Sequence, residues 1–267
     1  MTQTGWWSEA AATINSDIRQ QASERQNQLT KPPGSLGALE DIAISFAGFQ
    51  GQVKPQLEKP AAVVFAGDHG VVAQGVSAFP QAVTVEMLKN FVAGGAAVAV
   101  LAAYHQMPLA VVNCGTAIPC DTLPGVIQRP VMAGTADFSQ QAAMTTEQTE
   151  AALAIGKEQA ERLAAGGSEL LIAGEMGIGN TSAASCLSAL LLDQDVNALV
   201  GPGTGVQGEA LSHKQQVLAA SVARARPLVD SPFAALQQCG GLEVAAMAGF
   251  YLRAAQLGIP LLVDGFI

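Results

Sequence analysis

The chain has 267 residues, of which 49 % are hydrophobic and only 5 % aromatic, with 28 glycines and a formal net charge of −9. This composition is typical of an Ala/Gly/Val-rich α/β protein whose sheet is covered on both faces. The acidic balance argues against a nucleic-acid partner, because binding to a phosphate backbone needs a basic surface. The sequence shows no signal-peptide pattern, and its apolar runs are short, so we expect a cytoplasmic protein without a membrane span.

Two helices are predicted before the first strand signal. Ser8 is a plausible N-cap for a helix that runs to about Leu29. A second helix carries apolar residues at helical spacing over residues 36–49. We therefore expect residues 1–50 to form a small helical domain and residues 51–267 to form a Rossmann-like, substrate-binding domain.

From residue 61 onward, short apolar runs alternate with helical stretches. The runs predicted as strands are 61–66, 109–112, 169–172, 197–200 and 260–263. The stretches predicted as helices are 145–163, which starts with a Thr145–Gln148 capping box, 208–226 and 242–257. Strands that alternate with helices predict βαβ crossovers and a doubly wound, mostly parallel sheet in an α/β fold.

The most informative segment is 174–182, Gly-Glu-Met-Gly-Ile-Gly-Asn-Thr-Ser, which follows a predicted strand and precedes a helix-compatible stretch. Such a turn presents backbone N–H groups at a helix N-terminus, where phosphate is favoured. A second glycine-rich loop, 201–205, is followed by Lys214, which is either a fixed cation for phosphate or a solvated helix lysine. Neither loop has a complete ATP-binding or dinucleotide-binding fingerprint.

Glu175 lies at the carboxyl end of a strand, beside the predicted phosphate turn. A carboxylate there is electrostatically unfavourable unless a cation or a transferable proton offsets its charge. A general base near a phosphoribosyl group satisfies this condition. The alternative is a glutamate that caps the adjacent backbone N–H groups.

Other polar residues also follow predicted strands: Asp68-His69, Asn113 and Asp264. Each one alone is typical of a turn, but together they mark the sheet edge where ligands bind in this fold class. His69 is a candidate base or ligand, although a loop-locking hydrogen bond is the favoured interpretation. The four cysteines lack zinc-site spacing and are predicted to be buried thiols, and we expect no metal site.

Ordered blocks along the whole chain resemble the nicotinate-nucleotide–dimethylbenzimidazole phosphoribosyltransferase family. The segment 174–181 resembles the most specific signature of that family. The other matching blocks are 31–37, 67–71, 75–80, Val83-Thr84, Met87, Gly134-Thr135, 143–145, 203–205 and 241–243. The order and number of these blocks make chance agreement an unsatisfactory explanation.

The resemblance implies a homodimer that transfers the 5-phosphoribosyl group of nicotinate mononucleotide to 5,6-dimethylbenzimidazole, in assembly of the cobalamin nucleotide loop. The products would be nicotinate and α-ribazole 5'-phosphate, with no metal or cofactor required. Glu175 would be catalytic. The phosphate and ribose would contact Gly177, Ile178, Gly179, Asn180, Thr181, Lys214, Gly203, Thr204 and Gly205. The base pocket would be formed by Asp68, His69, Ser77, Phe79, Pro80, Met87 and Met176.

The sequence departs from the family pattern in three places. Asn113 replaces an aspartate, and Pro202 replaces a basic residue. The family's presumed general base, a glutamate in a C-terminal Gly-Glu-Gly-Thr-type motif, has no counterpart here. Three alternatives follow: Glu175 acts alone, the chain is a truncated, non-catalytic nucleotide- or benzimidazole-binding protein, or the chain is a fragment that does not fold stably.

Overall fold

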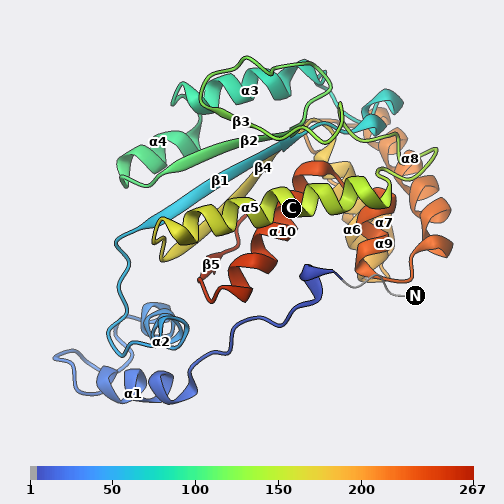
Figure 1. Ribbon diagram of the computed structural model, residues 1–267. Coiled ribbons are helices and arrows are strands. Elements are labelled where there is room, and N and C mark those ends of the chain that lie inside the picture. Colours follow the sequence, from blue (N-terminus) through green and yellow to red (C-terminus); the bar gives the residue numbers. More distant parts are fainter. Residues whose placement is uncertain (1–4) are drawn as a thin grey trace.

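The computed structural model describes residues 5–267, which contain a five-stranded parallel sheet with helices on both faces (Figure 1). The strand order is β3-β2-β1-β4-β5, and every neighbouring pair is parallel. The strands are β1 (Pro60–Gly67), β2 (Leu109–Gly115), β3 (Val126–Gln128), β4 (Leu170–Met176) and β5 (Leu261–Leu262). The predicted parallel α/β sheet is confirmed, and β3 is a strand that the sequence did not reveal.

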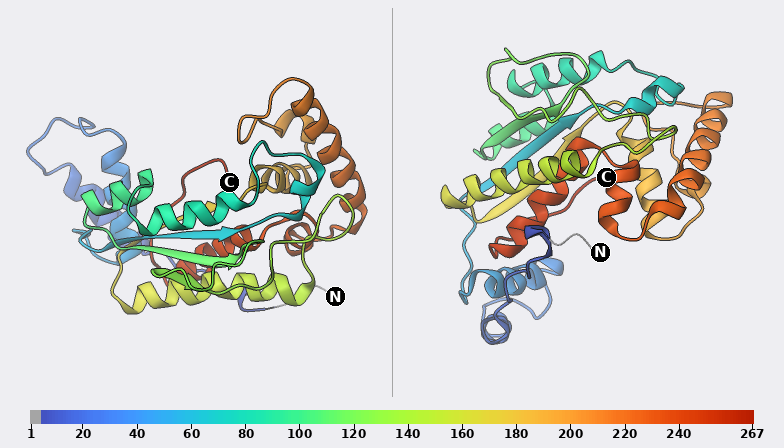
Figure 2. Two further views of the ribbon diagram at one scale, coloured as in Figure 1. Left: turned by 90° about the horizontal axis from the view of Figure 1, so that it is seen from above. Right: turned by 45° about the vertical axis from the view of Figure 1, so that its right-hand side comes forward.

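The central strand β1 is buried on both faces because its side chains alternate between two apolar clusters. Ala61, Val63 and Phe65 belong to the larger cluster, which α5 (Thr146–Ala165) and α10 (Leu242–Gln256) complete. Val64 and Ala66 belong to the smaller cluster, under α3 (Ala82–Val92) and α4 (Ala97–Tyr104). Figure 2 shows the sheet between these two helical layers.

Helices α5 and α10 pack so closely that their backbones touch. A Cβ atom at Gly156 would lie 1.8 Å from the carbonyl oxygen of Ala246, and one at Gly249 would lie 2.1 Å from that of Leu153. Neither glycine can therefore be replaced without separating the helices. The predicted capping box at the start of α5 is confirmed, with the Thr145 side chain accepting from the N–H of Gln148.

Four α-helices form a group beyond the carboxyl ends of the strands (Figure 1). They are α6 (Asn180–Leu191), α7 (Val196–Leu199), α8 (Glu209–Ala225) and α9 (Pro232–Cys239), with a short 3-10 helix η3 (Arg226–Leu228) after α8. The prediction of a strand over 197–200 was wrong, because residues 197–199 belong to α7 and Val200 is its C-cap. The Asp195 side chain caps α7 by accepting from the N–H of Asn197 at 3.0 Å.

The N-terminal region contains a 3-10 helix η1 (Trp6–Ser8), α1 (Ser16–Gln26) and α2 (Ala38–Gln50). The prediction that a helix starts at Ser8 was wrong. The N-cap is Asn15, whose side chain accepts from the N–H of Ile18 at 3.0 Å. Before α1 the chain runs along the body of the protein, where Trp7 stacks on Phe233 with ring centroids 5.4 Å apart. Helices α1 and α2 pack on each other and lie away from the sheet (Figure 1).

After β1, a 3-10 helix η2 (Gly70–Gln74) leads into α3 and α4. The segment Ala82–Tyr104 is long and apolar enough to cross a membrane by length and composition. The structure divides it at a turn, where Gly94 has a φ of +80°. The resulting helices, of 11 and 8 residues, are each shorter than the roughly 20 residues that a helical span needs.

Candidate active site

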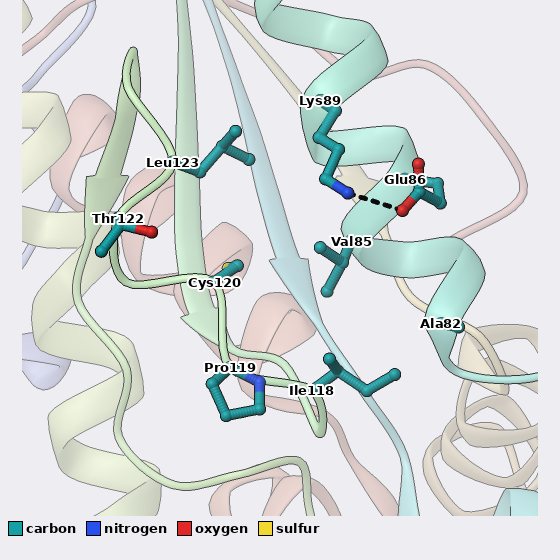
Figure 3. A pocket seen from close by; sticks show the side chains of 9 residues that line it. All are labelled: Ala82, Val85, Glu86, Lys89, Ile118, Pro119, Cys120, Thr122 and Leu123. Carbon is teal, nitrogen blue, oxygen red and sulfur yellow. Dashed lines mark hydrogen bonds and ion pairs between the residues drawn. The ribbon is translucent and has the colours of Figure 1, made fainter.

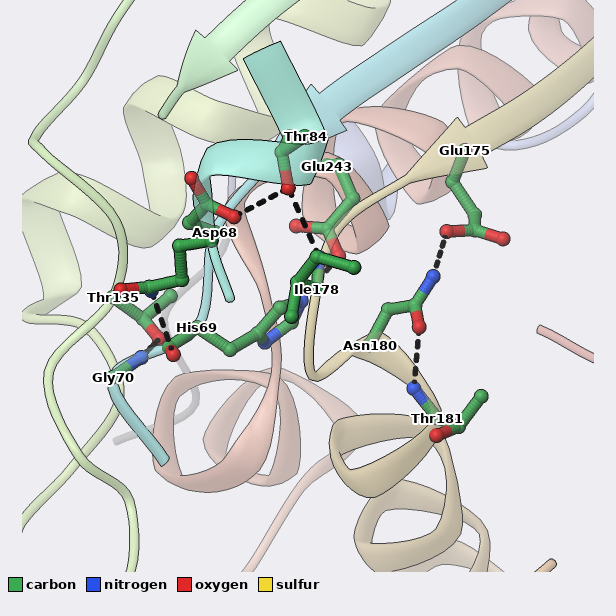
Figure 4. A network of polar contacts seen from close by, with 11 residues as sticks. Asp68, His69, Gly70, Thr84, Thr135, Glu175, Ile178, Asn180, Thr181 and Glu243 are labelled. Atoms are coloured by element: carbon green, nitrogen blue, oxygen red, sulfur yellow. Dashed lines mark hydrogen bonds and ion pairs between the residues drawn. The ribbon is translucent and has the colours of Figure 1, made fainter. Parts of the chain in front are cut away.

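The carboxyl ends of β1 and β4 bring together several polar residues that are distant in the sequence. The two strands are adjacent, with Phe65 opposite Glu175 and Ala66 opposite Met176. Asp68 and His69, which follow β1, therefore lie next to the turn that follows β4. Figure 4 shows this network, which combines predicted site residues with others that were not predicted as such, Thr84 and Glu243 among them.

The turn between β4 and α6 has the expected backbone shape but few free donors. Gly179 has a φ of +101°, and a Cβ there would lie 2.8 Å from Val72. The N–H groups of Ile178 and Thr181 donate to the side chains of Thr84 and Asn180, at 3.2 and 2.7 Å. The N–H of Asn180 donates to the carbonyl of Gly177 at 3.1 Å. An anion here would therefore depend on side chains and on the dipole of α6 more than on open backbone N–H groups.

Lys214 supplies the positive charge beside this turn. Its side chain comes from α8 and is only 1 % exposed, which rejects the interpretation of a solvated helix lysine. Nζ donates to Oγ1 of Thr181 at 3.1 Å and to the carbonyl of Gly201 at 3.4 Å. Burial lowers the pKa of Lys214. The ammonium, the Thr181 hydroxyl and the start of α6 together form a site that suits a small phosphate.

The second glycine-rich loop closes over Lys214 and Thr181. A Cβ at Gly203 would lie 2.7 Å from Oγ1 of Thr181 and 3.0 Å from Nζ of Lys214. The next residue, Thr204, joins this loop to the segment after η2, because its hydroxyl lies 3.2 Å from Oγ of Ser77. The N–H of Ala78 also donates to Thr204 Oγ1, at 3.3 Å. The two predicted glycine-rich loops, 174–182 and 201–205, are therefore in contact through Thr181 and Gly203.

Glu175 has an unusual electrostatic environment for a carboxyl group. Burial and the nearby negative charge of Glu243 raise its pKa from 4.5 to about 7. A hydrogen bond from the Asn180 side chain and the charge of His69 oppose this rise. Glu175 accepts a hydrogen bond from the side-chain amide of Asn180. Among the described residues it accepts none from the adjacent backbone N–H groups, so it does not cap them. A carboxyl with a pKa near neutrality is suited to proton transfer.

Asp68 and His69 lie beneath the site and are completely buried. Asp68 accepts from the Thr84 hydroxyl at 2.6 Å and from the N–H of Ala117 at 2.8 Å. Burial raises the pKa of Asp68, although these hydrogen bonds oppose it. Asp68 and His69 were predicted to line the base pocket, but neither side chain reaches an open surface. Both lie under the loops that follow the strands and hold them in place.

His69 forms an ion pair with Glu243, the second residue of α10, with Nε2 and Oε1 2.5 Å apart. Burial lowers the pKa of His69, but the carboxylates of Glu243, Asp68 and Glu175 outweigh burial and the net effect is a raised pKa. The loop-locking interpretation of His69 fits this contact. Sequence reasoning did not select Glu243, although it lies in the Gly-Leu-Glu block at 241–243 and is a charged residue in an otherwise apolar helix start.

The remaining predicted base-pocket residues surround the start of α3. Ser77 bonds the carbonyl of Phe79 at 3.2 Å, and Phe79 is 50 % exposed. Pro80 is also exposed. Met87 and Met176 are both partly buried against the smaller apolar cluster, so they lie on the side of the sheet that α3 covers. Glu175 pairs with Phe65 and therefore leaves β4 on the opposite face of the sheet from Met176.

A separate cavity of about 300 Å³ lies between α3 and the loop after β2 (Figure 3). One face of α3 lines it, with a Lys89–Glu86 ion pair of 2.7 Å. The opposite wall contains Ile118, Pro119, Cys120, Thr122 and Leu123. Met87 faces away from this cavity by helical periodicity, so the cavity is distinct from the predicted base pocket.

Two other polar strand-end residues have structural roles or lie apart. Asn113 is buried and bonds Gln128 and the N–H of Gly115, at 2.8 and 2.9 Å. Asp264 is exposed after β5. Within residues 5–267, no group of three or more His, Cys, Asp or Glu side chains is arranged to hold a metal ion. The four cysteines are buried free thiols, as predicted.

Comparisons with known proteins identify the family of the chain. A phosphoribosyltransferase family model matches residues 11–267. Nicotinate-nucleotide–dimethylbenzimidazole phosphoribosyltransferase of Pseudomonas aeruginosa (strain UCBPP-PA14) is 51 % identical over 262 residues, which are 98 % of this chain and 75 % of that protein. The enzyme of the same name from Pseudomonas putida (strain ATCC 47054) is 49 % identical over 267 residues, which are 100 % of this chain and 76 % of that protein.

A solved structure is similar over nearly the whole fold. The crystal structure of CobT from Thermus thermophilus has a TM-score of 0.89 and 46 % sequence identity, and the match covers 94 % of this chain and 75 % of that one. The chain thus spans about three-quarters of the length of the proteins that it matches. It belongs to the nicotinate-nucleotide–dimethylbenzimidazole phosphoribosyltransferase family, a group of glycosyltransferase-type enzymes.

Proposed function

We propose that the chain transfers the 5-phosphoribosyl group of nicotinate mononucleotide to 5,6-dimethylbenzimidazole, which gives nicotinate and α-ribazole 5'-phosphate for the cobalamin nucleotide loop. The names of its relatives support this reaction. The observation that carries it is the pairing of Glu175, whose pKa is raised to about 7, with the Lys214–Thr181 pair. A proton acceptor and a phosphate site thus lie on the two sides of one turn.

The phosphate would bind between Lys214, Thr181 and the N-terminus of α6. Lys214 and the Thr181 hydroxyl already point toward each other at 3.1 Å, so little reorganisation is needed. The Gly203–Gly205 loop would close over the phosphate and the ribose. A charge-assisted contact of this kind contributes about 1.5–3 kcal/mol to binding.

In the chemical step, one ring nitrogen of the benzimidazole forms a bond to C1 of the ribose. The bond between C1 and the nicotinate nitrogen breaks at the opposite face, and its electron pair leaves with nicotinate, so that the β configuration becomes α. The proton on the other benzimidazole nitrogen passes to the carboxylate of Glu175. A carboxyl whose pKa is raised to about 7 can accept this proton near neutral pH and release it again.

The acceptor base would lie on the apolar surface near Phe79, Pro80, Met87 and Met176, with Ser77 as a polar contact. The two methionine side chains belong to α3 and β4, and Met176 is adjacent to Glu175 in the chain. Methionine adapts well to flat aromatic ligands because its thioether is flexible and polarizable. The ring nitrogen would reach the carboxylate past the carboxyl end of β4, where the two faces of the sheet meet at the edge.

The test is product formation from nicotinate mononucleotide and dimethylbenzimidazole, followed by chromatography of nicotinate and α-ribazole phosphate. We expect the pure, folded chain to form both products in equal amounts, and Glu175→Gln to lower kcat by about 10²–10⁴-fold. The matched control is Glu158→Gln, which removes an exposed carboxylate paired with Arg129. Absence of product from the folded chain refutes the proposal.

A second candidate function is nucleotide or benzimidazole binding without turnover. The observation that favours it is the buried Lys214–Thr181 pair, which suits a phosphate and needs no proton transfer to bind it. Calorimetry that finds micromolar binding of nicotinate mononucleotide, together with no product, supports this candidate. Failure to bind either ligand rejects both functions.

We further propose a cytoplasmic homodimer with a Rossmann-like domain at 51–267 and a small helical domain at 1–50. The sheet order and the separation of α1 and α2 from the sheet support the two domains. The exposed side chains Val100, Leu101 and Tyr104 on α4 support association of two copies, being 54, 58 and 80 % exposed. Light scattering of the wild type and of Leu101→Asp tests the dimer, since a monomeric wild type rejects it.

A further inference from the structure

The ion pair between His69 and Glu243 is not needed for any step described so far. Both side chains are 0 % exposed, and the contact joins residues 174 positions apart in the sequence. His69 follows β1, whereas Glu243 lies at the start of α10. The pair therefore connects the end of β1 to the start of α10 at the candidate active site (Figure 4).

The pair is packed against glycines of the surrounding turns. A Cβ at Gly177 would lie 3.1 Å from Oε1 of Glu243, and one at Gly179 would lie 3.0 Å from Cβ of His69. A Cβ at Gly241 would lie 2.3 Å from Cε1 of His69. Glycine at these positions leaves the room that the two side chains occupy. The pair thus lies directly beneath the turn that joins Glu175 to α6.

The hydrogen bonding of the pair is incomplete. Among the described residues, Nδ1 of His69 and Oε2 of Glu243 are buried without a hydrogen-bond partner. A buried ion pair with unsatisfied polar atoms contributes little to stability, and an apolar pair of similar size is often as stable or more so. Stability alone therefore does not account for this pair.

We propose that Glu243 is a positioning residue, which His69 holds beneath the Gly177–Gly179 turn so that its buried carboxylate controls the protonation of Glu175. This inference rests on the proposed function and deepens it, since it assigns a residue that adjusts the proton acceptor. The groups that act on the charge of Glu175 are Asn180 from α6, which bonds it, His69 from the loop after β1 and Glu243 from α10. The negative charge of Glu243 raises the pKa of Glu175, and the positive charge of His69 lowers it.

The two partners should therefore have opposite effects. Glu243→Gln removes a negative charge and should move the titration midpoint of Glu175 to lower pH. His69→Gln removes a positive charge and should move that midpoint to higher pH. We expect each displacement to be about half a pH unit or more. A purely structural role for the pair would not give displacements of opposite sign.

The measurement is carbon NMR of the full chain labelled at glutamate side-chain carboxyls, titrated from pH 4 to 9. The Glu175→Gln spectrum identifies the Glu175 resonance by its disappearance. Leu163→Ala is the matched control for loss of stability, because Leu163 is buried at the end of α5 that is distant from the site. It should leave the Glu175 midpoint unchanged.

Should a single variant fail to fold, the double variant His69→Gln/Glu243→Gln replaces the ion pair with two amides that can bond each other. Its Glu175 midpoint should fall, since the effect of Glu243 exceeds that of His69. Midpoints that do not move, or that move in the same direction in both single variants, overturn the proposal. The titration needs no turnover, so it is decided independently of whether α-ribazole phosphate is formed. Where the wild type is active, the pH profile of kcat should move with each midpoint.

Discussion

Ionisation of Glu175 should destabilise the folded protein as the pH rises. The pKa of this carboxyl is 4.5 in an unfolded chain and about 7 in the fold, because burial and the charge of Glu243 favour the protonated form. A raised folded-state pKa gives stability that is fully present below pH 4.5 and is lost as the pH rises through about 7. The variant Glu175→Gln has the same size, cannot ionise and should not show this loss.

The magnitude follows from the two pKa values. The interval from 4.5 to about 7 at about 1.4 kcal/mol per pH unit gives a loss of about 3 kcal/mol for the wild type relative to Glu175→Gln. This is a large fraction of the net stability of a typical domain. The difference between the two proteins should therefore be easy to measure, and most of it should develop between pH 4.5 and 7.

Urea denaturation of both proteins at half-unit intervals from pH 4 to 8 provides the assay, with the free energy of unfolding as the readout. Titrating groups that do not interact with Glu175 contribute equally to the two proteins and cancel in the difference, whereas His69, whose pKa Glu175 helps to raise, contributes part of it. Glu169→Gln is a useful control, because hydrogen bonds from the N–H groups of Glu58 and Lys59 lower the pKa of Glu169. Ionised Glu169 should therefore stabilise the fold as the pH rises, the opposite of the effect of Glu175. A wild-type minus Glu175→Gln difference that stays constant over this pH range would refute the assigned environment of Glu175.

Three further changes probe the phosphate site and the scaffold. Lys214→Met keeps a buried apolar stem and should weaken nicotinate mononucleotide binding about tenfold to a hundredfold by calorimetry, so an unchanged Kd would contradict a phosphate contact. Gly179→Ala should destabilise the fold by about 1–3 kcal/mol and weaken nucleotide binding, because the residue has a φ of +101° and a Cβ would contact Val72. Gly34→Ala is its control, with a φ of +73° but no neighbour within 4 Å, and should leave binding intact. Thr145→Ala should cost about 1 kcal/mol through loss of the α5 cap, measured as a lower Tm, with unchanged nucleotide affinity.

Local patterns predicted most of the sheet and the longest helices. The runs that became β1, β2 and β4 are continuous and apolar because these strands are buried on both faces. The run 197–200 misled because a four-residue apolar stretch fits a strand or a helix equally well. Asp195, two residues before it, is the capping signal that favours a helix. The start of the first helix is likewise set by its N-cap, which is Asn15 and not Ser8.

The site was predictable where its residues are neighbours in the chain. Glu175, Asn180 and Thr181 lie within one strand–turn–helix unit, so their proximity follows from local structure. Glu243 lies 174 positions from His69, and only the sheet topology brings the two together. Its role as a buried partner therefore could not be deduced from spacing.

The backbone contact between α5 and α10 has a consequence for redesign of this enzyme. Gly156 and Gly249 leave no space for α10 to slide along α5, so the height of the first turn of α10 relative to the sheet is fixed. If Ser77–Pro80 line the proposed base pocket, changes to this segment should therefore alter which base is accepted without disturbing this alignment. Base preference and the α5–α10 packing should therefore be alterable independently of each other. A library that varies residues 77–80 and keeps Gly156 and Gly249 should yield a high proportion of folded proteins.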